Sequence, residues 1–157
     1  MTGFRRGVRL GIDVGKARVG VARCDPDGML AVPVETVPRD ERSLARLAQL
    51  AEEYAPLEFV VGLPVNMQGA DTPSTVDARE FAAALLRLTG IPVRMIDERL
   101  STVSAHAALR SSGRNQKNSR SIVDQVAAVV LLQQAIDTEK STGSPAGSVV
   151  QTDEEPS

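Results

Sequence analysis

Three acidic residues stand out because each lies at the edge of an apolar segment that should belong to the core. Asp13 interrupts the apolar alternation of residues 8–14 and would project opposite its apolar side chains. Glu98 follows the apolar segment 92–96 almost directly, and Asp124 stands at the start of a long apolar helical segment. Buried carboxylates are costly unless they are paired or bound to metal, so these three are candidate functional residues.

Carboxylates that meet in one site need a positive partner. Two of them about 4 Å apart repel by about 4 kcal/mol at an effective dielectric constant of about 20. Mg²⁺, or Mn²⁺, is the natural counterion because it prefers oxygen ligands and is commonly shared with substrate phosphates. Two such ions about 3.5–4 Å apart clamp the attacking and leaving oxygens of a phosphodiester displacement. The three acids therefore indicate metal-dependent phosphodiester hydrolysis.

Each acid also has a simpler interpretation that the sequence leaves open. Asp13 could lie on an exposed sheet face or make a hydrogen bond at a strand end. Asp97 and Glu98 could together occupy a helix N-terminus, where the macrodipole favours negative charge. Ser121 and Asp124 resemble a capping box with a shortened acid.

The elements that must position these residues predict an α/β fold with one mixed five-stranded sheet and helices on both faces. Alternating and buried apolar patterns predict strands at 8–14, 18–24, 29–37, 59–62 and 92–96, the first three as an antiparallel meander. Helical periodicity predicts helices after Asp40, which could cap the first, and at 76–88, 102–110 and 122–136, with a polar loop at 111–119.

Length and composition favour a single domain. The chain has 157 residues, which we divide into a domain at 1–138 and a disordered acidic tail at 139–157. One cysteine, Cys24, and one histidine, His106, exclude an internal disulfide and a zinc site built from several such ligands. The N-terminus lacks the features of a secretory signal, and no apolar run approaches the roughly 20 residues of a membrane span. We therefore expect a cytoplasmic protein with no membrane partner.

Positive charge gathers near the third acid. The chain has a net charge of −2, but residues 94–120 hold six cations against two acids. Arg114, Lys117 and Arg120 precede the helix that carries Asp124 and could bind phosphates. Lys16 and Arg18, just after the first strand, could reach a phosphate near the metals. A solvated surface is the alternative for both groups.

The first strand and turn also suggest a competing function. Gly11 to Gly15, with Gly20 further on, resembles the phosphate-binding hairpin of actin-like ATPases and sugar kinases. Those enzymes need two such domains and a glycine-rich adenosine site. A chain of 157 residues has no room for them, which argues against a kinase or an ATPase.

Four motifs in the same order resemble the YqgF family of ribonuclease H-like proteins, also called RuvX, which comprises proposed pre-16S rRNA nucleases and Holliday junction resolvases. They are GIDVGKARVG at 11–20, VGLPVNMQG at 61–69, DERLST at 97–102 and VDQVAA at 123–128. The resemblance implies a ribonuclease H-like fold in which Asp13, Glu98 and Asp124 form the catalytic, metal-binding triad. Asp97 would replace Glu98 if that assignment failed.

The resemblance also implies a nucleic-acid surface and a substrate. Contacts are expected from the 63–69 loop, which contains Asn66, and from the basic segment with Arg99, Arg114, Lys117 and Arg120. The implied role is trimming of the 5′ end of pre-16S rRNA by a monomer or homodimer.

Two alternatives are resolution of four-way DNA junctions by a dimer and nucleic-acid binding without catalysis. Resolvases of the related RuvC type look as if they use a fourth acid one turn along the last helix. This chain has Ala127 and Ala128 there. This departure weakens the junction-resolving interpretation.

Overall fold

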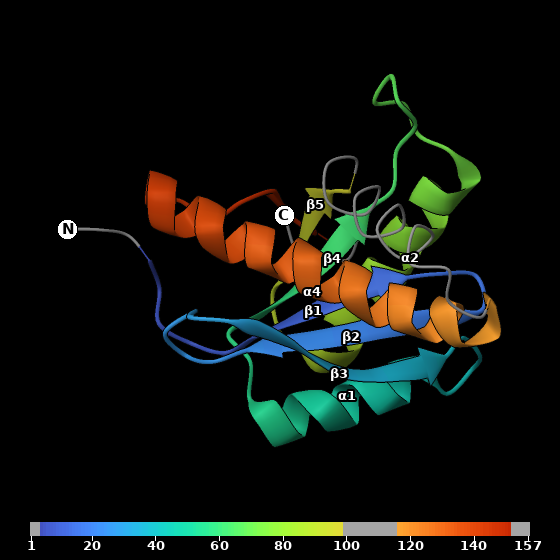
Figure 1. Ribbon diagram of the computed structural model, residues 1–157, viewed down its shortest axis with the longest axis horizontal. Helices are drawn as coiled ribbons and strands as arrows, with labels where there is room; N and C mark the ends of the chain where they lie inside the picture. The colour runs from blue at the N-terminus through green and yellow to red at the C-terminus, as the bar shows by residue number, and fades with distance from the viewer. Residues whose placement is uncertain (1–3, 99–115, 152–157) are drawn as a thin grey trace.

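The computed structural model describes residues 4–98 and 116–151, and for 116–124 only the path of the helix. It contains a six-stranded sheet in the order β3-β2-β1-β4-β5-β6 with helices on both faces (Figure 1). The strands are β1 (Arg9–Val14), β2 (Arg18–Cys24), β3 (Ala31–Pro38), β4 (Glu58–Leu63), β5 (Val93–Asp97) and β6 (Ser148–Val149). The helices are α1 (Ser43–Tyr54), α2 (Pro73–Thr89) and α4 (Gln116–Thr142).

The first three strands form the predicted antiparallel meander, and β1, β4 and β5 run parallel to one another. The turn between β2 and β3 is held by Asp25, whose carboxylate accepts hydrogen bonds from the backbone N–H groups of Asp27, Met29 and Leu30. These bonds replace the backbone ladder where the chain reverses. The mixed sheet follows from a local hairpin meander joined to crossover connections.

The ends of α2 follow capping signals in the local sequence, whereas the start of α1 does not follow the predicted one. Thr72 and Thr75 form a reciprocal capping box that starts α2 before the predicted residue, and Gly90 ends it in the left-handed conformation at φ 71°. The prediction that Asp40 caps the first helix is wrong. Asp40 instead accepts a hydrogen bond from the N–H of Arg42, which is the N-cap residue and has no side-chain cap.

Two apolar layers sandwich the sheet. Helices α1 and α2 cover one face with a core that includes Leu10, Ile12 and Phe81. Helix α4 covers the other face, where Leu132 and the carbonyl oxygen of Ala128 lie against Gly11. Because side chains alternate along β1, this helix defines the face toward which every second residue points.

Helix α4 is longer than predicted at both ends. It begins at Gln116, so residues 116–119 belong to the helix rather than to the predicted loop. It ends at Thr142, and the N–H of Gly143 bonds to the carbonyl of Glu139 at 2.8 Å. Ile136 and Glu139 are buried near the C-terminal end, and such packing stabilises helical turns whose own sequence is polar. The predicted helix at 102–110 lies outside the described residues.

The segment 139–157 is not the continuous disordered tail that the composition suggested. Its first residues complete α4, and β6 pairs antiparallel with β5, with Met95 opposite Ser148. The backbone hydrogen bonds of an edge strand explain this order, since an exposed sheet edge offers unpaired donors and acceptors to any extended segment. The sheet therefore has six strands instead of five.

An ion-pair cluster lies at the end of the sheet away from Asp13. Arg9 is 1% exposed, and its guanidinium donates to Glu139 at 3.2 Å and to two backbone carbonyls. Arg5 donates to both Glu139 and Glu58, and Arg94 donates to Glu58. The buried charges are thereby paired, as burial requires. Among the described helices, none is both long enough and apolar enough to cross a membrane.

Candidate metal centre

Asp13 is buried on the α4 face of the sheet. It is the fifth residue of β1 and is 8% exposed. Gly11, two residues earlier, points toward α4, because a Cβ placed on it would meet Leu132 and Ala128. Alternation along the strand therefore directs Asp13 to the same face, under the helix rather than to solvent. The alternative of an exposed sheet face is excluded.

On the two neighbouring strands, the residues that lie beside Asp13 are glycines. In the antiparallel register Asp13 pairs with Gly20, which in turn pairs with Thr36 on β3. On the other side, the parallel register that joins Ile12 to Val61 brings Gly62 next to Asp13. Adjacent strands are about 4.8 Å apart, so two missing side chains leave room beside the carboxylate.

Glu98 reaches the space above Gly62. Its backbone N–H donates to Leu63 at 3.1 Å, which extends the ladder between β4 and β5 by one residue. Its side chain is 8% exposed, and its Cγ and Cδ lie 2.7 Å from the position that a Cβ on Gly62 would take. Asp97, one residue earlier in β5, alternates toward the opposite face. Of the two neighbouring acids, Glu98 is the one on the face of Asp13.

The backbone of α4 brings Asp124 near the row of paired residues that crosses the sheet through Asp13, Gly20 and Thr36. Gln125 donates from Nε2 to Thr36 at 2.8 Å, and Thr36 belongs to the row that contains Asp13. Asp124 lies one turn before Ala128, which is fully buried against Gly11. Since α4 begins at Gln116, the capping-box interpretation of Asp124 is wrong.

The donor set fits a hard divalent cation. Asp13 and Glu98 contribute carboxylate oxygens beside and above the same glycine, which is the ligand type that Mg²⁺ and Mn²⁺ prefer. Over the described side chains, no three acidic, histidine or cysteine groups gather at one point. A third ligand at this site would come from the α4 segment around Asp124.

The predicted phosphate contacts at the β1–β2 turn lie at the same end of the sheet. Lys16 is exposed and, with Arg39, Ser74 and Asp77, lines a pocket of about 450 Å³ at the first turn of α2. Arg39 donates two hydrogen bonds to Asp77 and lowers the pKa of that carboxyl, and the charge of Lys16 adds to the effect. Arg18 is half-buried at the start of β2, where its carbonyl accepts from Gly15.

The other residues predicted to bind nucleic acid do not belong to the β1–β2 turn. Asn66 has a structural role, because its Oδ1 accepts hydrogen bonds from the N–H groups of Gln68 and Ala70 and closes the loop after β4. Lys117 and Arg120 lie in the first turns of α4, before Asp124. Arg99 and Arg114 lie outside the described residues. Of the predicted set, the structure therefore describes the side chains of Lys16, Arg18 and Asn66.

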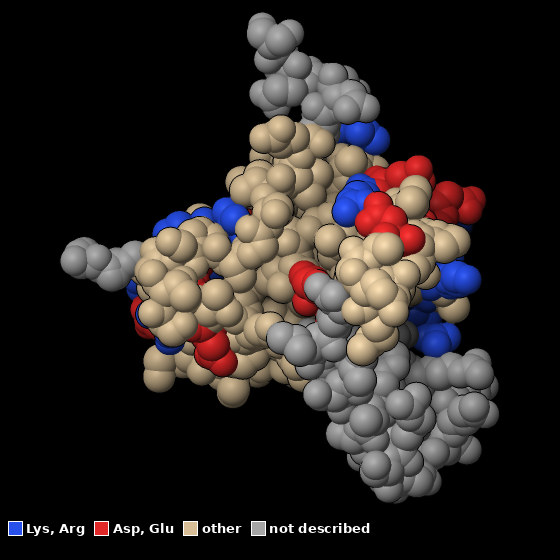
Figure 2. All heavy atoms as spheres, turned by 90° about the horizontal axis from the view of Figure 1, so that it is seen from above, with Lys and Arg blue, Asp and Glu red and all other residues tan. Residues whose placement is uncertain are grey.

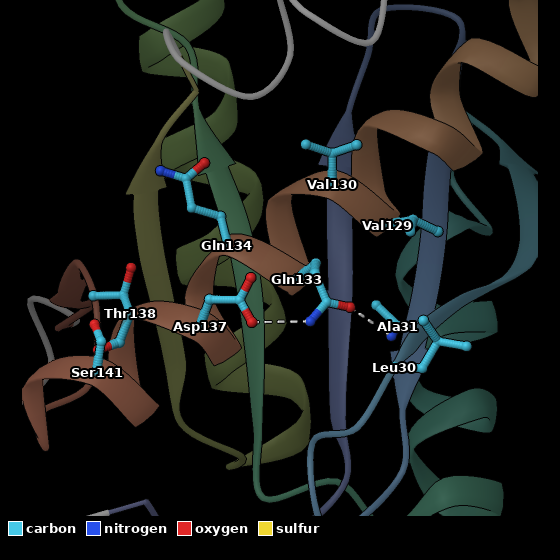
Figure 3. Close-up of a pocket in the computed structure, with 9 residues that line it drawn as sticks. All are labelled: Leu30, Ala31, Val129, Val130, Gln133, Gln134, Asp137, Thr138 and Ser141. Carbon is cyan, nitrogen blue, oxygen red and sulfur yellow. Dashed lines mark hydrogen bonds between the residues drawn. The ribbon is translucent and has the colours of Figure 1, made fainter.

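Among the described residues, a groove larger than the Lys16 pocket is lined by α4 and by residues just before and at the start of β3. It has a volume of about 690 Å³ and runs along the outer side of α4, where the side chain of Gln133 accepts a hydrogen bond from the N–H of Ala31 (Figure 3). Among its described lining residues the one acid is Asp137, which accepts from Gln133 at 3.1 Å. In the view of Figure 2, charged side chains gather at the two ends of the molecule, and the middle carries little charge. This groove lacks the converging acids that metal chemistry needs.

The fold defines a protein of the ribonuclease H-like class, and solved structures agree. The chain is similar to Thermus thermophilus RuvC in complex with a Holliday junction substrate, with a TM-score of 0.55 and 18% identity over 88% of this chain and 98% of that one. A second structure of Thermus thermophilus RuvC gives a TM-score of 0.52 at 17% identity, covering 88% of this chain and 99% of that one. The expected fold class is confirmed.

The chain belongs to the RuvX family, described as Holliday junction resolvase, whose model matches residues 7–138. A relative from Clavibacter michiganensis, named "Putative pre-16S rRNA nuclease", is 54% identical over 94% of this chain and 93% of its own length. A relative of the same name from Streptomyces avermitilis is 51% identical over 95% of this chain and 97% of its own length. The predicted family is thus confirmed, and these names support a nuclease.

Proposed function

We propose that this protein is a divalent-metal-dependent endonuclease that cleaves structured RNA in the cytoplasm, with the 5′ end of pre-16S rRNA as its substrate. The observation that carries the proposal is the meeting of two buried carboxylates, Asp13 and Glu98, around one glycine beneath α4. The names of the relatives from Clavibacter and Streptomyces support the choice of RNA.

Each part of the site has a task in this proposal. Asp13 and Glu98 would hold the cation, and Asp124, the third acid of the predicted triad, belongs to α4. A divalent cation held there would supply positive charge to stabilise the charge that develops on the phosphodiester oxygens during cleavage. Lys16, at the same end of the sheet, orients the phosphate backbone through its exposed ammonium group. Burial beneath α4 lowers the local dielectric constant and strengthens these interactions.

The proposal is tested by incubating the protein with end-labelled structured RNA and four-way DNA, each in Mg²⁺ and in EDTA. We expect discrete RNA cleavage that requires Mg²⁺ and little cleavage of the DNA. Preferential cleavage of the junction would favour the resolvase function. The description of the family model and the RuvC neighbour support that alternative. Binding of either substrate without any cleavage would contradict an enzyme and favour a non-catalytic binding protein.

The choice between the two neighbouring acids gives a direct prediction. Glu98→Gln should remove nearly all Mg²⁺-dependent cleavage, because it removes a charge from the face of Asp13. Asp97→Asn should have a milder effect, since Asp97 alternates toward the other face of the sheet. Initial rates of RNA cleavage over a range of Mg²⁺ concentrations measure both. An inactive Asp97→Asn variant beside an active Glu98→Gln variant would exchange the two roles.

The basic residues before Asp124 should position the nucleic-acid backbone. Replacing Arg114, Lys117 and Arg120 with alanine should weaken binding of every nucleic acid and lower the salt slope by about 0.7 to 0.9 per lost phosphate contact. Fluorescence anisotropy at several salt concentrations measures both quantities. Arg42→Ala, which removes an exposed charge next to α1 on the other side of the sheet, is the control. Unchanged affinity and slope in the triple variant would exclude these residues as a binding element.

A further inference from the structure

Gly62 lies in the middle of the core sheet without a backbone reason to be glycine. It is the fifth residue of the six-residue strand β4 and pairs with Ile96 on β5. It is not among the glycines with positive φ, so its backbone would accept any L-residue. Glycine inside a strand weakens it, and often marks a place where another group approaches closely.

The group that approaches Gly62 is the side chain of Glu98. All three atoms nearest to a Cβ on Gly62 belong to that side chain: Oε2, and then Cδ and Cγ, each at 2.7 Å. Real Cβ atoms essentially never have neighbours so close, so any other residue at this position would displace the glutamate. The space that a side chain would fill at position 62 is occupied by the carboxylate of Glu98.

The same displacement would change the position of Glu98 relative to Asp13. The parallel register brings Gly62 next to Asp13, and the Glu98 carboxylate lies above Gly62. Both acids are 8% exposed, so little open volume remains into which Glu98 could move without leaving this face. A shift of the carboxylate away from β4 would separate the two acids.

We propose that Gly62 is a positioning residue: its missing side chain lets the Glu98 carboxylate lie against β4 beside Asp13, so that both acids hold the same divalent cation. This inference rests on the proposed metal-dependent function. It assigns to the strand glycine of the VGLP segment a role in building the site, through Glu98, rather than in contacting the substrate.

Gly90 serves as a matched control. It ends α2 at φ 71°, and a Cβ there would meet no described atom within 4 Å. It lies before β5, at the end of that strand away from Glu98. Gly90→Ala should therefore strain the backbone and lower stability without moving Glu98.

The first experiment measures Mn²⁺ affinity by calorimetry for the wild type, Gly62→Ala, Gly90→Ala and Glu98→Gln. Loss of a group that orients a metal ligand typically costs about 10- to 100-fold in affinity, and we expect a loss of this size for Gly62→Ala. Gly90→Ala should bind Mn²⁺ like the wild type. Wild-type affinity in Gly62→Ala would overturn the inference alone, whereas wild-type affinity in Glu98→Gln would contradict the proposed function itself.

The second experiment keeps the inference testable if Gly62→Ala folds poorly. The unfolding midpoint in urea is compared for Gly62→Ala alone and in a Glu98→Ala background, where the clashing side chain is gone. The cost of Gly62→Ala should largely disappear in that background, because the two residues interact directly. An equal cost in both backgrounds would mean that the glycine accommodates something other than Glu98, and the inference would fail.

Discussion

Asp13→Asn should lower Mg²⁺-dependent RNA cleavage by about 1000-fold or more while the protein remains folded. The substitution keeps the shape of a buried side chain and removes one of the charges that hold the cation. A catalytic metal contributes several kcal/mol of transition-state stabilisation, and each 1.4 kcal/mol corresponds to a factor of ten in rate. Single-turnover cleavage rates and far-UV circular dichroism measure the two parts of this expectation.

A thermal readout separates loss of metal from loss of folding. Mg²⁺ that binds only the native state raises the melting temperature of the wild type and should leave that of Asp13→Asn nearly unchanged. Asp27→Asn is the control, because Asp27 forms an exposed ion pair with Arg6 far from the site. Normal Mg²⁺-dependent cleavage by Asp13→Asn would contradict the assignment of this residue as a metal ligand.

The second large effect concerns stability. Glu139→Gln should lower the free energy of unfolding by about 3–5 kcal/mol, because it leaves the buried guanidinium of Arg9 without its carboxylate partner. Urea denaturation at pH 7 measures this loss. Glu35→Gln is the matched control, since Glu35 and Arg46 form a half-exposed pair for which a loss of about 1 kcal/mol or less is expected.

The effect of Glu139→Gln should depend on pH in a defined direction. Burial by itself would raise the pKa of Glu139, but hydrogen bonds from Arg5 and the charge of Arg9 outweigh it and lower the pKa to about 2. The stabilisation is therefore complete above the ordinary pKa of 4.5 and is lost as the pH falls toward 2. The difference between wild type and variant should shrink over this range, and a constant difference would contradict the ion-pair account.

The Arg9→Met and Glu139→Leu double variant tests whether the pair is needed at all. Apolar replacement of both partners of a buried pair is often neutral or stabilising, whereas removal of one partner is not. The double variant should therefore be more stable than Glu139→Gln. If it were less stable by the full sum of the single losses, the two residues would act independently.

The strands of this fold could be predicted because their signals are local. The alternation in 8–14 and the turn residues after Cys24 predicted β1, β2 and the meander, and the structure has them within a few residues. The same local pattern marked Asp13, since an acid out of phase in an apolar strand is visible in the sequence alone. Its burial on the α4 face agrees with that interpretation.

Features that depend on contacts between distant residues were missed. Glu139 was assigned to an acidic tail because its partners, Arg5 and Arg9, are more than 120 residues away. The end of α4 had a local signal, Gly143, which adopts φ 78° just after the last turn. That glycine and the apolar spacing up to Ile136 could have extended the predicted helix.

The acids of the candidate site could be proposed from the sequence, but their arrangement could not. Sequence alone left Asp97 and Glu98 as alternatives, and the alternation of β5 together with the contact to Gly62 places Glu98 on the face of Asp13. The role of Gly62 depends on the register of two neighbouring strands, for which the sequence carries no local signal. The contact of Asn66 with nucleic acid stays a prediction, and in the structure its side-chain oxygen accepts hydrogen bonds from the backbone of its own loop.

The central claim is that Asp13 and Glu98 hold a divalent cation together. The most direct test is an anomalous difference map from a crystal of the full chain soaked in Mn²⁺ at a concentration that supports cleavage. We predict a peak within coordination distance of carboxylate oxygens from both residues, above Gly62 and beneath α4. A peak coordinated by Asp97 instead, or no peak near Asp13, would contradict the account.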